Sequence, residues 1–324
     1  MLQKILGRGS ARSIRWCMSL GFGLSFLAMQ SLSAAYPEKS AKSNKPRLEE
    51  KLKTLSKGSS SEETQRRALA ELPLDKLSPV HRTQAQEVLN HLSLFRELPT
   101  LAVETTPEVH QFFLDHPEMA VAIWRAMKIS KFHLKAEQPG IYNATDNEGT
   151  EGRVEVLYRD RHQMLVWCDG VAESPLLPMA IKAHSLLHLQ MDFIKTKDDV
   201  IWSRNRLRMF VAFPSDAIET AAKVVSPLGN LIIDRNLREV CMFVAMMSTA
   251  MVHQPGWVEH IARNVDEVSK ERKAELIQLT AEVFVTARKR ALEKQNPDEK
   301  VTLEDIIRPL QDQKETNAVS KTTK

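Results

Sequence analysis

The sequence VIWSRNRLRMFVAF, residues 200–213, sets the pattern of the predicted sheet. Its apolar side chains alternate with Arg204, Arg206 and Arg208, and a period of two is typical of a β-strand with one buried face. A second stretch, SPLGNLIIDRNLREVCMFVAMMSTAM (residues 226–251), spaces its apolar residues along one side of a helix. A sheet with one apolar face and a methionine-rich helix lying over it predicts a two-layer α+β domain.

The residues before this strand predict the rest of the sheet. From Ser130 onward the apolar period becomes two, with one predicted hairpin over residues 153–169 and another over residues 181–213. In the second hairpin we pair His188 with Arg206, because this register buries the odd-numbered residues and leaves the even-numbered ones on a solvated face. The overall prediction is α+β, with an antiparallel β-meander of about five to six strands packed against a long helix and helical extensions at both ends.

Helix start signals divide the chain into segments. Ser61, Ser78 followed by Pro79, Thr106 followed by Pro107, and Pro117 each predict the beginning of a helix. The predicted organisation is a targeting segment (1–35), a disordered linker (36–61), a helical segment (62–128), the sheet-and-helix domain (129–254), C-terminal helices (256–312) and a disordered tail (313–324). The amphipathic part of the C-terminal region spans residues 265–294.

Residues 1–35 have the three-part layout of a secretory signal peptide. A basic stretch ending at Arg15 precedes the apolar run 17–30, and small residues follow up to Ala35. We expect either cleavage after Ala35 or an uncleaved membrane anchor. A helix that spans a bilayer needs about 20 apolar residues, and the run 17–30 is shorter than that. Both alternatives place the remaining chain across the cytoplasmic membrane, in the periplasm or cell envelope.

Charge and motifs argue against several classes of function. The formal net charge is +4, and Lys4, Arg8, Arg12 and Arg15 account for all of it. The near-neutral body therefore lacks the basic footprint of a nucleic-acid-binding protein. No nucleophile elbow, zinc-protease motif, phosphate-binding loop or paired Cys-x-x-Cys occurs, so we expect a non-enzymatic protein with no catalytic residue and no cofactor.

Metal and disulfide sites are not predicted. Cys168 and Cys241 make no metal site, and the sequence leaves open whether they pair or are simply buried as small apolar residues. His184 and His188 share a face, with Asp192 as a third possible ligand, but the arginines expected opposite them would repel a cation.

The two faces of the predicted sheet give two candidate binding sites. The apolar face and the helix predict a cavity for an apolar ligand or lipid, lined by Leu207, Met209, Val211, Phe243, Met247 and Met251. The opposite face predicts an anion patch for a phosphate or lipid headgroup, formed by Arg204, Arg206, Arg208 and His188. A plain apolar core and a plain solvated face are the alternatives for the same residues.

Two resemblances accompany these patterns. Short helices, a meander and a long helix over roughly residues 130–252 resemble the helix-grip arrangement of the START-related lipid-binding superfamily, with RNRLRMFVAF and the following helical stretch as the most similar part. The segment LDHPEMAVAIWRAMKIS (residues 114–130) resembles a family of uncharacterised exported bacterial proteins, which carries no activity over to this chain. The first resemblance implies lipid binding.

Two hypotheses for function follow. The first is an exported or membrane-anchored, non-enzymatic protein that encloses an apolar ligand between sheet and helix. The second is a structural or interaction protein of the cell envelope that binds a protein partner through its C-terminal amphipathic helix.

Overall fold

The computed structural model describes residues 48–147, 149–172, 180–214, 216–295, 301–302 and 304–306, with the backbone alone for residues 216–228. The predicted targeting segment and tail lie outside the described residues. The chain divides into two compact units: the first comprises the residues up to Met246 together with Val265–Val268, and the second comprises Met247–Asn264 and the residues from Ser269 onward. In the part of the chain described, no helix is long and apolar enough to cross a membrane.

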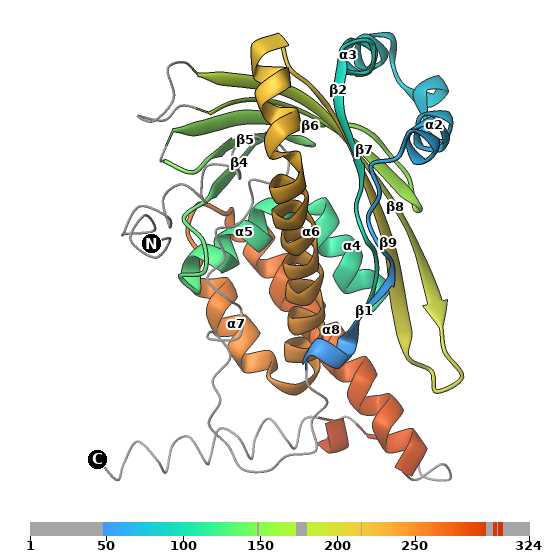
Figure 1. Cartoon of the computed structure of the whole chain (residues 1–324). Helices are drawn as coiled ribbons and strands as arrows, with labels where there is room; N and C mark the ends of the chain where they lie inside the picture. The colour runs from blue at the N-terminus through green and yellow to red at the C-terminus, as the bar shows by residue number, and fades with distance from the viewer. Residues whose placement is uncertain are drawn as a thin grey trace, which may run out of the picture. The chain divides into compact units, whose positions relative to one another are not determined.

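The first unit is built on one nine-stranded antiparallel sheet with the order β1-β3-β9-β8-β7-β6-β5-β4, in which β2 also pairs with β9. Consecutive strands from β4 to β9 are neighbours and form a meander (Figure 1). The α+β class is confirmed, and the sheet has more strands than the sequence predicts. The strands are β1 (Leu52–Ser56), β2 (Leu92–Glu97), β3 (Thr100–Glu104), β4 (His133–Gln138), β5 (Ile141–Thr145), β6 (Thr150–Arg159), β7 (Gln163–Ala172), β8 (Ile181–Lys195) and β9 (Ile201–Ala212).

Three strands arise where the sequence does not predict them. β1 falls in the predicted linker 36–61, and β2 and β3 fall in the predicted helical segment 62–128. β2 pairs with residues 208–212 of β9, and β3 pairs with residues 202–205 of the same strand. These are short segments whose extended conformation depends on hydrogen bonds to a partner distant in the chain, so their local pattern does not reveal them.

Helices cover both faces of the sheet (Figure 1). α2 (Glu62–Ala70) and α3 (Pro79–Asn90) lie over one face, and α4 (Pro107–Asp115), α5 (Pro117–Ala126) and the long α6 (Asp216–His253) lie over the other. The predicted caps are confirmed, since the Ser61 and Ser78 hydroxyls accept hydrogen bonds from backbone N–H groups of the first turns of α2 and α3. α6 is one continuous helix that contains the predicted helical stretch 226–251 and begins ten residues before it.

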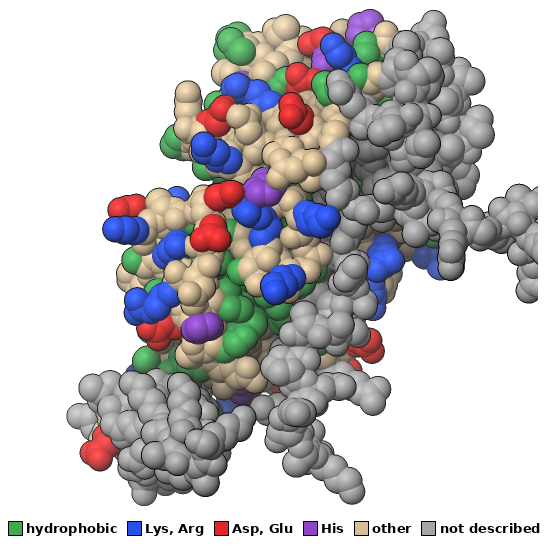
Figure 2. Space-filling view, turned by 90° about the vertical axis from the view of Figure 1, so that its left-hand side faces the viewer, with side chains coloured by type: hydrophobic (Ala, Val, Ile, Leu, Met, Phe, Trp, Pro, Cys, Tyr) green, Lys and Arg blue, Asp and Glu red, His purple; other side chains and the backbone are tan. Residues whose placement is uncertain are grey.

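Short helices and the second unit complete the chain. The 3₁₀ turn η3 (Leu48–Lys51) directly precedes β1, and the 3₁₀ turn η4 (Leu74–Lys76) follows α2. In the second unit, α7 (Pro255–Asn264) and α8 (Lys270–Gln295) contact each other. On the face drawn in Figure 2, acidic and basic side chains of the described residues are interspersed, which fits the near-zero charge of the body.

Apolar cores lie between these layers. The core under α6 contains Leu207, Met209 and Val211 of β9 together with Ile233, Leu237 and Cys241 of α6. The core under α2 and α3 contains Leu186 and Phe210, which lie on the face that the sequence predicts to be solvated. That prediction is wrong for this half of the face, because its apolar residues are covered by two helices.

The pairing of the last hairpin also differs from the prediction. His188 pairs with Arg208, two residues further along β9 than the predicted Arg206. A shift of two residues keeps every side chain on its predicted face, because side chains alternate with a period of two. The turn between the strands is correspondingly longer, so β8 ends at Lys195 and β9 begins at Ile201.

Candidate functional site

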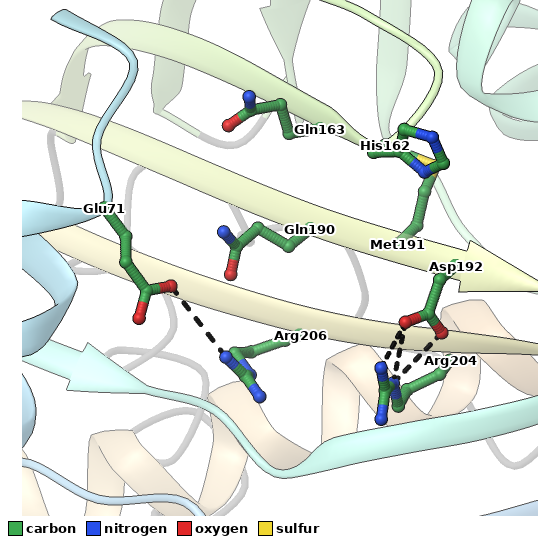
Figure 3. A pocket seen from close by; sticks show the side chains of 8 residues that line it. All are labelled: Glu71, His162, Gln163, Gln190, Met191, Asp192, Arg204 and Arg206. Atoms are coloured by element: carbon green, nitrogen blue, oxygen red, sulfur yellow. Dashed lines mark hydrogen bonds and ion pairs between the residues drawn. The ribbon is translucent and has the colours of Figure 1, made fainter.

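A pocket of about 430 Å³ lies on the arginine-bearing face of the sheet, beside the C-terminal end of α2. Glu71 closes it from the α2 side, and the other lining residues come from β8, β9 and the start of β7 (Figure 3). The lining residues are Glu71, His162, Gln163, Gln190, Met191, Asp192, Arg204 and Arg206.

The polar side chains of this region form three successive rows across the strands. The deepest row is Glu97, Arg208 and His188, the middle row is Arg206, Gln190 and Gln163, and the outermost row is Arg204 and Asp192. Neighbouring strands lie about 4.8 Å apart, and rows two residues apart along a strand are separated by about 6.7 Å. The antiparallel register therefore places hydrogen-bonding side chains side by side on the floor of the pocket.

Arg208 belongs to the interior and not to the pocket surface. Its side chain is 0% exposed, its Nε donates to Glu97 Oε2 at 2.9 Å, and its Nη1 donates to Glu71 Oε2 at 2.8 Å. A buried charge needs such partners, because an unpaired one in the interior is strongly unfavourable. The sequence places Arg208 on a solvated patch, whereas the structure makes it the buried anchor of two carboxylates.

His188 is also completely buried. Its Nε2 donates to Oε1 of Gln163 at 3.0 Å, which leaves Nδ1 as a buried acceptor without a hydrogen-bond partner in the described part of the chain. Burial and the neighbouring Arg208 charge lower the pKa of His188 to about 4. His188 is therefore neutral near pH 7 and adds no positive charge to an anion site.

Arg206 is the cation that the pocket leaves most available. Its guanidinium lies beside Glu71 (Figure 3), and the described residues offer it one ion pair, between its Nη1 and Glu71 Oε2 at 3.9 Å. The same Glu71 oxygen already accepts from Arg208 at 2.8 Å, and the Arg206 side chain is 39% exposed. Arg206 thus keeps donors that a ligand in the pocket can use.

Glu71 is the counter-charge at this point. Burial raises the pKa of its carboxyl, but the hydrogen bond and charge of Arg208, helped by Gln190 and Arg206, outweigh burial and hold the pKa below its usual value. Glu71 is therefore ionised in the free protein near neutral pH.

Arg204 is already paired. Its Nε donates to both carboxylate oxygens of Asp192, at 3.0 and 3.1 Å, and its Nη2 also contacts Asp192 (Figure 3). This cross-strand pair closes the rim of the pocket and neutralises itself. Of the predicted anion patch, the structure thus brings Arg204 and Arg206 to one pocket and puts Arg208 and His188 beneath its floor.

The residues of the predicted apolar cavity are distributed over different contacts. Leu207, Met209 and Val211 pack in the core under α6. Phe243 makes edge-on ring contacts with Phe113 and Trp124, each at 5.2 Å between centroids. Met247 and Met251 are completely buried and belong to the second unit. None of the six lines the pocket described above.

A second pocket of about 610 Å³ also lies in the first unit, with Arg125 and His133 in its lining. Both of these side chains contact the carboxylate of Glu267, which neutralises the Arg125 charge. The exposed Lys128 and Lys131 lie near Asp146 and Asp266, so the lining has mixed charge and no single anchoring group. The described residues also contain no group of three or more His, Cys, Asp or Glu that could hold a metal ion.

Several site residues escape sequence reasoning. Glu71 comes from a helix more than a hundred positions before Arg206, and only the packing of α2 on the sheet brings them together. Gln163 and Gln190 are paired neighbours on β7 and β8, but their neutral amides give no motif in the sequence. Cys168 and Cys241 are both buried and unpaired.

Comparisons with known proteins assign no function to this pocket. No family model matches the chain, and no curated protein matches it. Among solved structures, it is similar to a conserved protein from Geobacillus kaustophilus with a TM-score of 0.31 and 11% sequence identity, over 45% of this chain and 93% of that chain. A similarity of this size carries no argument about function.

Proposed function

We propose that the protein is an exported, non-catalytic binding protein that takes a small acidic ligand in the pocket beside α2, with Arg206 as the anchor. The observation that carries this proposal is the state of Arg206, whose side chain is partly exposed and whose one described ion pair is 3.9 Å long. The other two arginines of the same strand face already donate to carboxylates at hydrogen-bonding distance.

The chemistry of the lining suits an acidic group. A guanidinium presents a planar fork of N–H donors that matches a carboxylate or phosphate, and such charged hydrogen bonds are stronger than neutral ones. The amide of Gln190 stands beside Arg206 in the same row and adds a donor. The volume of about 430 Å³ falls within the range of small-molecule pockets.

Other ligands and activities receive less support. The lining contains no hydroxyl or thiol side chain, and its carboxylates Glu71 and Asp192 are both held by arginines, so it offers no activated nucleophile of the serine or cysteine kind. An apolar ligand between sheet and helix would have to displace Leu207, Met209 and Val211 from a core that they share with α6. The lipid-binding role implied by the START-related resemblance therefore has weaker support than a polar ligand.

The hypothesis of a protein partner depends on the predicted C-terminal amphipathic helix, which corresponds to α8 in the structure. Its apolar residues Leu276, Val283 and Phe284 are buried within the chain, with Val285 left partly exposed. An apolar side that the chain itself covers is less suited to a protein partner. Export rests on residues 1–35 alone, and N-terminal sequencing of the exported protein distinguishes a cleaved signal from a retained anchor.

Calorimetric titration with sulfate, phosphate and succinate tests the binding proposal. Arg206→Gln should weaken binding by at least about tenfold, since charged hydrogen bonds contribute roughly 1.5–3 kcal/mol. Arg263→Gln, which removes an exposed arginine of the second unit, serves as the matched control and should bind like the wild type. Equal binding by the Arg206 and Arg263 variants, or no binding of any probe by the wild type, would overturn the proposal.

A further inference from the structure

The position of Glu71 is unfavourable for the helix that carries it. Glu71 is the C-terminal cap of α2, and its backbone N–H donates to the carbonyl of Arg67. The C-terminal end of a helix carries a partial negative charge that disfavours a carboxylate. Contacts outside the helix, with Arg208 and more distantly with Arg206, hold the carboxylate in place.

An acidic ligand and Glu71 would compete for the same cation. The groups facing Glu71 are Arg206 and Arg208 from β9 and Gln190 from β8. Arg208 is already divided between Glu71 and Glu97. A ligand that takes Arg206 therefore removes one favourable charge from Glu71 and adds an unfavourable one beside it.

The remaining charges nearby do not relieve this conflict. Arg67 pairs with Glu97 from the other side at 3.4 Å and is 55% exposed, so solvent screens it. His188 beneath the floor is neutral near pH 7. The least costly way to accommodate a second acid is to remove the charge of the first.

We propose that Glu71 occupies the place of the ligand's acid group at Arg206 in the free protein, and that an acidic ligand binds together with one proton, which Glu71 receives from solvent. This inference rests on the proposed function. It makes Glu71 the residue that sets how strongly the pocket prefers an anion, and it predicts tighter binding in acidic surroundings.

The direction of the pH dependence follows from the two states of Glu71. Its pKa is below the usual value in the free protein and rises when a second negative charge lies beside it. Between these two pKa values, binding takes up a proton and the affinity falls by up to about tenfold per pH unit as the pH rises. Outside that interval, Glu71 has the same charge with and without ligand, so its contribution to the pH dependence disappears.

Calorimetric titration of the full chain with inorganic sulfate from about pH 5 to about pH 7.5 tests the inference, because sulfate keeps its charge over this range. Every protein compared carries His162→Gln, which removes the one imidazole of the pocket lining. Titrations in buffers with different ionisation enthalpies count the protons taken up when sulfate binds to the protein with Glu71 intact, so this count does not require a replacement of Glu71.

Glu71→Gln keeps an acceptor for Arg208 and removes the charge. We expect this variant to bind sulfate about tenfold more tightly at neutral pH and to lose most of the pH dependence. Unchanged affinity in Glu71→Gln, or no proton uptake with Glu71 intact, would overturn the inference while leaving anion binding in place. If no protein binds sulfate at any pH, the proposed function fails instead.

Discussion

Replacing Arg208 by methionine should destabilise the first unit more than the same change at Arg204 on this strand face. Methionine keeps much of the apolar stem and removes the charge. Glu97, with a side chain 11% exposed, then loses its hydrogen bond from Arg208 and keeps only the exposed Arg67 at 3.4 Å. The buried Glu97 carboxylate is then nearly unpaired, and this unpaired charge accounts for most of the free energy lost when a buried ion pair is broken.

The size of the effect follows from burial. Removing one partner of a buried pair costs about 3–5 kcal/mol, and we expect about 3 kcal/mol because Glu71, with a side chain 34% exposed, regains hydration. The double variant Arg208→Met with Glu97→Gln should recover roughly half of this loss, since the stranded charge disappears. Arg204→Met is the matched control on the same face, and its exposed pair with Asp192 predicts a cost of about 0–1 kcal/mol.

Urea unfolding followed by circular dichroism measures these differences. In thermal unfolding, about 2–4 °C per kcal/mol predicts a shift of roughly 6–12 °C for Arg208→Met and less than about 4 °C for Arg204→Met. Equal costs for the two single variants would show that the buried row contributes no more than a surface pair. A double variant no more stable than Arg208→Met alone would contradict the role assigned to Glu97.

Three further predictions concern titration, thiol reactivity and packing. Burial lowers the pKa of both His110 and His188 to about 4. The unfolded chain therefore binds protons first as the pH falls below about 6.5, and the free energy of unfolding should decrease by up to about 1.4 kcal/mol per pH unit per histidine down to about pH 4. Urea midpoints measured against pH check this, and His110→Gln should reduce the slope. Burial raises the pKa of Cys168 and Cys241 to about 12, so a thiol reagent at mildly alkaline pH should label them only on unfolding; rapid labelling of the native protein would contradict this. Phe243→Ala should cost about 3–5 kcal/mol if this ring is solid core, and a loss below about 1.5 kcal/mol would favour the cavity that the sequence predicts.

Local sequence patterns were sufficient to predict those helices and strands whose pattern lies within their own residues. The hairpins β6–β7 and β8–β9 follow from alternation that each strand carries in its own residues, and the starts of α2 and α3 follow from Ser61 and Ser78. The buried face of β9 was also predictable, because a register error of two residues leaves every side chain on the same side. These features depend on neighbours in the chain, which the sequence displays directly.

The candidate site depends on contacts between distant residues. Glu71 and Arg208 are 137 positions apart, and Glu97 and Arg208 are 111 apart. Arg204, Arg206 and Arg208 occupy equivalent positions in the alternating sequence of β9. In the structure, Arg208 is buried between Glu71 and Glu97, Arg204 pairs with Asp192 at the surface, and Arg206 is left available. The protonation state and the energetic contribution of a charged side chain depend on its burial and on the charges of its partners. The alternation of residues therefore fixed which way Arg206 points, and only the packing of α2 over the sheet gave it a pocket and a competing carboxylate.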